Sequence, residues 1–225
     1  MYKNTGTVTR NYTSNAILTT NSVIRNTYIL LSATLGFSAI TAWFAMVTYA
    51  QPMGLMSLLI YFGLFYVTTK LKDSVWGIAA VFALTGFLGY TLGPMLNYYI
   101  SEYVNGSELI ATSLGLTAII FFTLSGYALS TKKDFSYLGG FLMVGIMVAF
   151  IASIAGLFFH IPALQLAVSA GFVLISSGMI LYETSQIIHG GERNYIMATI
   201  SLYVSLYNLF ISLLHILAAF SGRRN

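Results

Sequence analysis

Seven stretches of apolar residues, joined by short polar segments, constrain the fold of this chain most. They cover residues 27–48, 53–69, 75–100, 109–130, 137–159, 163–188 and 195–220. A helix that crosses a hydrocarbon core of about 30 Å needs about 20 apolar residues, so most runs are long enough and the second is near the lower limit. Only 7% of the residues are charged, whereas a soluble domain carries about 25%. The sequence therefore predicts an all-α polytopic membrane protein with seven transmembrane helices in a lipid bilayer.

The polar segments predict the domain limits and the orientation. Residues 1–26 are polar and predict an N-terminal tail, residues 27–220 form the transmembrane domain, and residues 221–225 form a short C-terminal tail. With seven spans, basic residues are concentrated in the loops on the same side of the membrane as the N-terminus. This predicts a cytosolic N-terminus and an outward C-terminus. They lie one to three at a time beside apolar runs, so we expect no nucleic-acid partner. The eight on the N-terminal side are Lys3, Arg10, Arg25, Lys70, Lys72, Lys132, Lys133 and Arg193, against Arg223 and Arg224 on the other side.

Glu183 is the clear ionisable residue at membrane depth. It lies in the sixth run, six residues from His189 at the following turn, which is about 9 Å of helix. Burying such a group costs several kcal/mol unless it is paired or hydrated. Glu183 is therefore a candidate for proton sensing, for cation binding or for closing a gate by hydrogen bonding. The alternative is a structural role, in which it contacts interfacial water or pairs with Lys70 or Lys132.

The seventh run has the densest polar content, and four of its residues follow helical spacing. Because steps of four, three and four residues share one helical face, they form a stripe that should face other helices or water rather than lipid. The seventh helix is therefore predicted to be central in the bundle. The stripe has two interpretations, hydrogen bonding between helices or the lining of an ion path. Its members are Ser201, Ser205, Asn208 and Ser212.

Small residues predict where helices approach one another closely. Gly89 and Gly93 lie in the third run, beside Pro94, which is expected to kink that helix. The pairs Ser32/Gly36 and Ala152/Gly156 have the same spacing and predict two further packing sites.

Catalytic chemistry has no support in the sequence. The chain lacks cysteine, which excludes thiolate metal sites and cysteine nucleophiles. Hydrolase, zinc-protease and P-loop motifs are absent, and the seventh run has no lysine for a Schiff base. His160 and His215 are predicted near the outer face and His189 near the inner face, too far apart to share a metal ion. We therefore expect neither an enzyme, nor a metal site, nor a cofactor.

Four segments together resemble the Bax inhibitor family of seven-helix membrane proteins. The resemblance covers the chain from about Val23 onward and implies six helices around a central seventh, with the N-terminus cytosolic. It is closest to bacterial members of the inner membrane, which implies a periplasmic C-terminus and a non-enzymatic regulator that binds and restrains the membrane protease FtsH. The segments are Gly86–Pro94, Lys133–Gly140, Gly178–Glu192 and Ser201–Phe210.

The same resemblance implies an alternative function, a pH-sensitive leak of calcium or protons. Members of the wider family have been linked to such a leak, governed by one acid on the sixth helix and one on the seventh. Glu183 matches the first position, Ser205 occupies the second, and Lys70 matches a basic residue near the end of the second helix; Asn208 lies nearby. A carboxyl beside a hydroxyl cannot share a proton as two carboxyls do, and it binds divalent cations more weakly. The departure at Ser205 favours the FtsH regulator over the leak.

Overall fold

The computed structural model describes the backbone of residues 6–159 and 161–222 and the side chains of residues 20–156 and 161–222. In this part of the chain, seven α-helices account for the regular structure and no β-strand occurs. They are α1 (Gly6–Val47), α2 (Leu55–Leu71), α3 (Trp76–Glu102), α4 (Gly106–Thr131), α5 (Leu138–Phe159), α6 (Pro162–His189) and α7 (Tyr195–Ala219).

These helices confirm the prediction of an all-helical membrane protein. Six of them contain a segment long and apolar enough to span a bilayer, and the 17-residue α2 is the shorter apolar helix. The helix α1 is longer than predicted, because it begins at Gly6 within the polar N-terminal segment.

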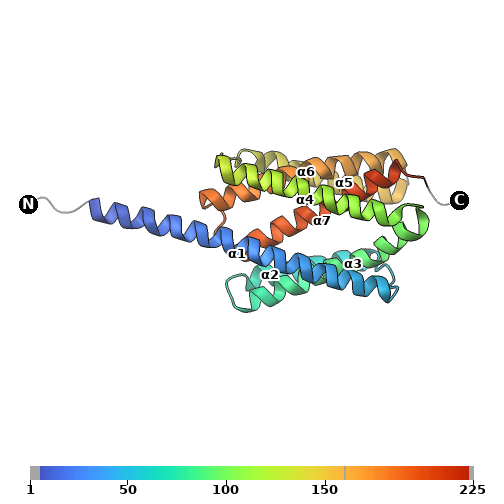
Figure 1. The fold of residues 1–225 in the computed structure, drawn as a ribbon, viewed down its shortest axis with the longest axis horizontal. Coiled ribbons are helices and arrows are strands. Elements are labelled where there is room, and N and C mark those ends of the chain that lie inside the picture. Colours follow the sequence, from blue (N-terminus) through green and yellow to red (C-terminus); the bar gives the residue numbers. More distant parts are fainter. Residues whose placement is uncertain (1–5, 160, 223–225) are drawn as a thin grey trace, which may run out of the picture.

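The helix α7 runs between two groups of helices, α1–α3 on one side and α4–α6 on the other (Figure 1). It packs along α1, α3, α4 and α6, whereas α2 packs mainly on α3 and α5 mainly on α6. Half of its most apolar segment is buried, a larger share than in any other candidate span of the described residues. The helix that carries the polar stripe is therefore the candidate span with the largest buried share among the described residues.

Helices α1 and α3 approach each other closely at two glycines. A Cβ atom at Gly89 would overlap the backbone oxygen of Ser38, and one at Gly93 would overlap Ala45. The helix α3 continues through Pro94 to Glu102. Glycine therefore lets the backbones of these two helices lie in direct contact.

The packing predicted at Ser32 and Gly36 is wrong. Both residues are exposed, and nothing lies within 4 Å of a Cβ built at Gly36. At Gly156 the nearest atom to such a Cβ is a side-chain carbon of Gln165 at 3.9 Å, an ordinary contact. The spacing of small residues alone does not distinguish a lipid-facing face from a packed one.

The turn between α6 and α7 and the last turns of α6 hold two other loops at the same end of the bundle. Asn194 caps α7 by accepting from the backbone N–H of Ile196 and Met197, and its amide donates to the Lys72 carbonyl (3.1 Å) and to Asp73 (2.8 Å). In α6, the Ser185 hydroxyl accepts from the backbone N–H of Phe135 (2.9 Å) in the α4–α5 loop.

Candidate functional site

Glu183 lies on α6 with 9% of its surface exposed. Among the polar side chains of α7, Ser201 is the one that acts on its carboxyl, and Glu192 is the acid that acts on it. Among the described side chains Glu183 forms no ion pair. The Lys70 ammonium lies instead over the Tyr66 ring, 5.5 Å from its centre. The structure thus places Glu183 against the polar stripe of α7 rather than against Lys70.

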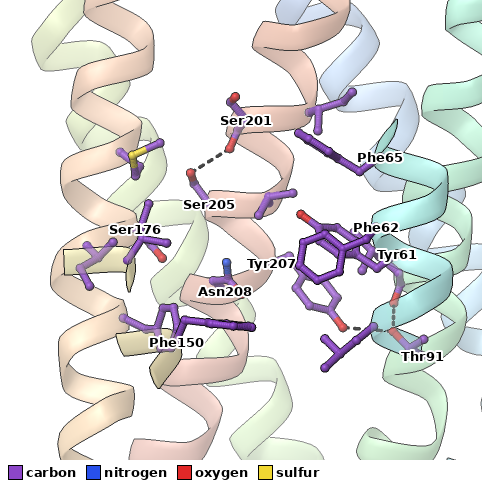
Figure 2. Close-up of a pocket in the computed structure, with 18 of the residues that line it drawn as sticks. Tyr61, Phe62, Phe65, Thr91, Phe150, Ser176, Ser201, Ser205, Tyr207 and Asn208 are labelled. Atoms are coloured by element: carbon purple, nitrogen blue, oxygen red, sulfur yellow. Dashed lines mark hydrogen bonds between the residues drawn. The ribbon is translucent and has the colours of Figure 1, made fainter. Parts of the chain in front are cut away.

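The N-terminal part of the α7 stripe lines a cavity of about 460 Å³. Ser201, Ser205 and Asn208 form its polar wall, and the Ser205 hydroxyl donates to the Ser201 backbone oxygen (2.8 Å; Figure 2). Helices α2, α3, α5 and α6 form the other walls, largely with aromatic and aliphatic side chains. The predicted candidates Ser205 and Asn208 are thus brought together at one cavity.

Two further cavities continue along the same stripe. Asn208, Ser212 and His215 line a space of about 360 Å³ between α5, α6 and α7. His215 also lines a space of about 480 Å³ near the C-terminal end of α7, together with Tyr99 and Tyr103. The shared residues Asn208 and His215 make the three cavities neighbours, so the stripe borders open space along most of its length.

The opposite face of α7 carries a hydrogen-bonded network that the sequence analysis did not identify. The buried Tyr203 hydroxyl donates to the Thr85 backbone oxygen on α3 (3.1 Å) and meets the Ser38 hydroxyl on α1. One turn away, the Thr199 hydroxyl lies 3.3 Å from the Thr27 carbonyl oxygen on α1. Tyr203 was visible as a polar residue of a dense run, but its partners lie 118 and 165 positions away in the sequence.

The described residues contain no group of three or more His, Asp or Glu side chains that could hold a metal ion. His189 lies near the Lys132 carbonyl (3.1 Å) at one end of the bundle, and His215 lies beside Tyr99 near the C-terminal end of α7. His160 lies outside the described residues. In the described part of the chain, the His189 ring therefore contacts the start of the α4–α5 loop and does not form part of a metal-ligand set.

Comparison with known proteins identifies the family. The profile of the family described as "Inhibitor of apoptosis-promoting Bax1" matches residues 20–222. The chain is 54% identical over 211 residues to the Modulator of FtsH protease YccA of Escherichia coli K12, across 93% of this chain and 95% of that protein. It is also 54% identical over 203 residues to an uncharacterized protein of Pseudomonas aeruginosa, across 90% and 91% of the two chains. The resemblance found in the sequence is confirmed: this multi-pass membrane protein belongs to the Inhibitor of apoptosis-promoting Bax1 family.

Proposed function

We propose that this chain is a non-enzymatic protein of the bacterial inner membrane that binds the membrane protease FtsH and restrains its activity. The observation that carries the proposal is the 54% identity to the E. coli modulator of FtsH, which extends over 93% of this chain and 95% of that relative. Similarity of this extent includes all seven helices rather than one shared segment.

The shape of α1 supports a cytosolic contact with such a protease. At 42 residues, the helix is about 63 Å long, roughly twice the hydrocarbon thickness. Its first turns extend past the other helices (Figure 1), at the bundle end that carries Lys70, Lys72 and Lys132. Since basic loops favour the cytosol, we propose that residues 1–26 are cytosolic and that the C-terminus is periplasmic.

The site favours the regulator over the alternative of a cation leak. The second acid position of the two-acid arrangement is Ser205, whose hydroxyl donates to the Ser201 backbone oxygen. A divalent cation prefers several charged oxygen ligands, and Glu183 supplies one carboxyl. We therefore assign Glu183, Ser205, Asn208 and Lys70 no role in conducting ions.

The test is expression of the full chain in E. coli cells that lack their own YccA. We expect FtsH to enrich on the tagged chain after detergent extraction, and the half-life of an FtsH membrane substrate to rise about two-fold or more. Removal of residues 2–19 should reduce both effects while the protein still inserts. The matched control removes residues 223–225, at the opposite terminus. Absence of FtsH enrichment together with an unchanged substrate half-life would refute the proposal.

A further inference from the structure

One cavity beside α7 opens to the lipid-facing surface between α2 and α5. Leu58 and Phe62 on α2 and Ile146 and Phe150 on α5 line the 460 Å³ cavity described above. All four are also exposed on the outer surface of the protein. In a membrane this surface faces acyl chains, so the cavity opens sideways into the bilayer. Its volume is within the range of small-molecule sites, about 300–1,000 Å³.

The inner wall of this cavity holds polar groups that lack partners. Ser176 on α6 is only 3% exposed, and Asn208 on α7 faces the same space (Figure 2). Among the residues whose side chains the structure describes, none forms a hydrogen bond with the Ser176 hydroxyl or with the Asn208 amide. Asn208 is half-buried. Because a polar group inside a bilayer is costly without a hydrogen-bond partner, these two groups favour a hydrogen-bonding occupant of the cavity.

The depth of these groups restricts the chemistry of the occupant. Asn208 lies 13 residues from the first residue of α7 and 11 from the last, which is about 20 Å and 17 Å of helix. It is therefore near the middle of the bilayer. The charged headgroup of a phospholipid stays at the interface, because a charge at this depth is costly. An occupant that enters from the bilayer must carry an uncharged hydrogen-bonding group on an apolar body.

We propose that this cavity binds a neutral membrane lipid with a flat, carbonyl-bearing ring and an apolar tail, the chemistry of the isoprenoid quinones. The ring carbonyls accept hydrogen bonds from the Asn208 amide and the Ser176 hydroxyl. The faces of Tyr61, Phe65 and Tyr207 surround the ring, and the tail leaves between α2 and α5. This site is independent of the proposed action on FtsH and stands or falls separately.

The test uses the full-length protein in nanodiscs of phosphatidylethanolamine and phosphatidylglycerol, with an azido-substituted ubiquinone as photolabel. Mass spectrometry of peptides locates the label, and decylubiquinone competes for the site. We expect saturable labelling within residues 55–71 and 199–210. Asn208→Leu should raise the concentration of decylubiquinone that halves the labelling about ten-fold. Ser176→Ala should raise the same concentration about three-fold or more.

Controls separate specific binding from partitioning into the lipid. Ser113→Ala removes an equally buried serine on α4 whose hydroxyl bonds its own helix (2.7 Å), and it should leave competition unchanged. Decylbenzene has the tail but no carbonyl and should not compete. Labelling that decylubiquinone fails to displace, or equal displacement by decylbenzene, would overturn the proposal.

Discussion

The two faces of α7 carry similar polar residues but differ in how those residues are satisfied. Toward α1 and α3, the Tyr203 hydroxyl has protein partners on both helices, and two glycines bring the neighbouring backbones together. Toward α5 and α6, Asn208 and Ser212 border open cavities. The first face is closely packed and largely hydrogen-bonded, although the buried Thr27 hydroxyl on α1 has no partner among the described residues. The second face borders space for an occupant. In a membrane protein, the role of a polar stripe therefore depends on whether neighbouring helices supply hydrogen-bond partners for it.

The largest effect on stability should come from a bulky side chain at the close contact between α1 and α3. Gly89→Leu forces a side chain into the Ser38 backbone oxygen, and overpacking of this kind costs about 3 kcal/mol or more where the backbone cannot move. We expect a large fall in the free energy of unfolding, measured by titration with sodium dodecyl sulfate in mixed micelles. The control is Gly36→Leu, because nothing lies within 4 Å of a Cβ there. Equal effects of the two substitutions would show that α1 and α3 do not pack as described.

The second comparison removes two hydroxyls that both bond to α3, one buried with two partners and one half-buried with a single side-chain partner. Tyr203→Phe breaks the contacts with Thr85 and Ser38 and should lower the free energy of unfolding by about 1 kcal/mol, within the range of hydrogen bonds between membrane helices. Tyr207→Phe breaks one half-buried contact with Thr91 (3.1 Å) and should cost about half as much. The same unfolding titration measures both. A larger loss for Tyr207→Phe would show that the contacts of Tyr203 are not the stronger link between α7 and its neighbours.

Asn208→Leu should have a smaller effect, and of the opposite sign. Because the amide has no partner among the described side chains, its replacement removes an unsatisfied group and leaves the free energy of unfolding unchanged or raised by up to about 1 kcal/mol. The measurement is made without added quinone, so it also shows that this variant folds before it is used in binding experiments. Asn97→Leu is the matched control, because the Asn97 amide donates to the Met46 carbonyl (2.9 Å), and it should destabilise. If Asn208→Leu is the more damaging change, the polar groups of the open face are structural.

The sequence predicted the helices well and the site only in part. Apolar runs have a fixed minimum length in a bilayer, so six of the seven helices could be placed from hydropathy, and α1 differed because a helix can continue into a polar segment. The α7 stripe was visible because helical spacing is local information. The partners of Tyr203, the aromatic wall on α2 and the close contact at Gly89 depend on which helices become neighbours. The wrong prediction at Gly36 has the same origin, since its spacing matches that of a packed glycine while its face is open.

Removal of a solvent-exposed hydroxyl should have the smallest effect on stability and provides a reference for the buried ones. In the α4–α5 loop, the exposed Asp134 accepts hydrogen bonds from the backbone N–H (2.8 Å) and the hydroxyl of Ser136, and these bonds lower the pKa of Asp134. A lowered pKa means that any contribution to stability is present above the ordinary pKa of aspartate and is lost as the pH falls through the lower value. Ser136→Ala should raise the pKa of Asp134 toward its ordinary value, measured by carbon NMR of the carboxyl group. It should lower the free energy of unfolding at pH 7 only slightly, because water replaces the lost hydroxyl at this exposed site. The loss should be smaller than that of Tyr203→Phe, because the Tyr203 hydroxyl is shielded from water. An equally large loss would show that shielding from water does not explain the effect of Tyr203→Phe.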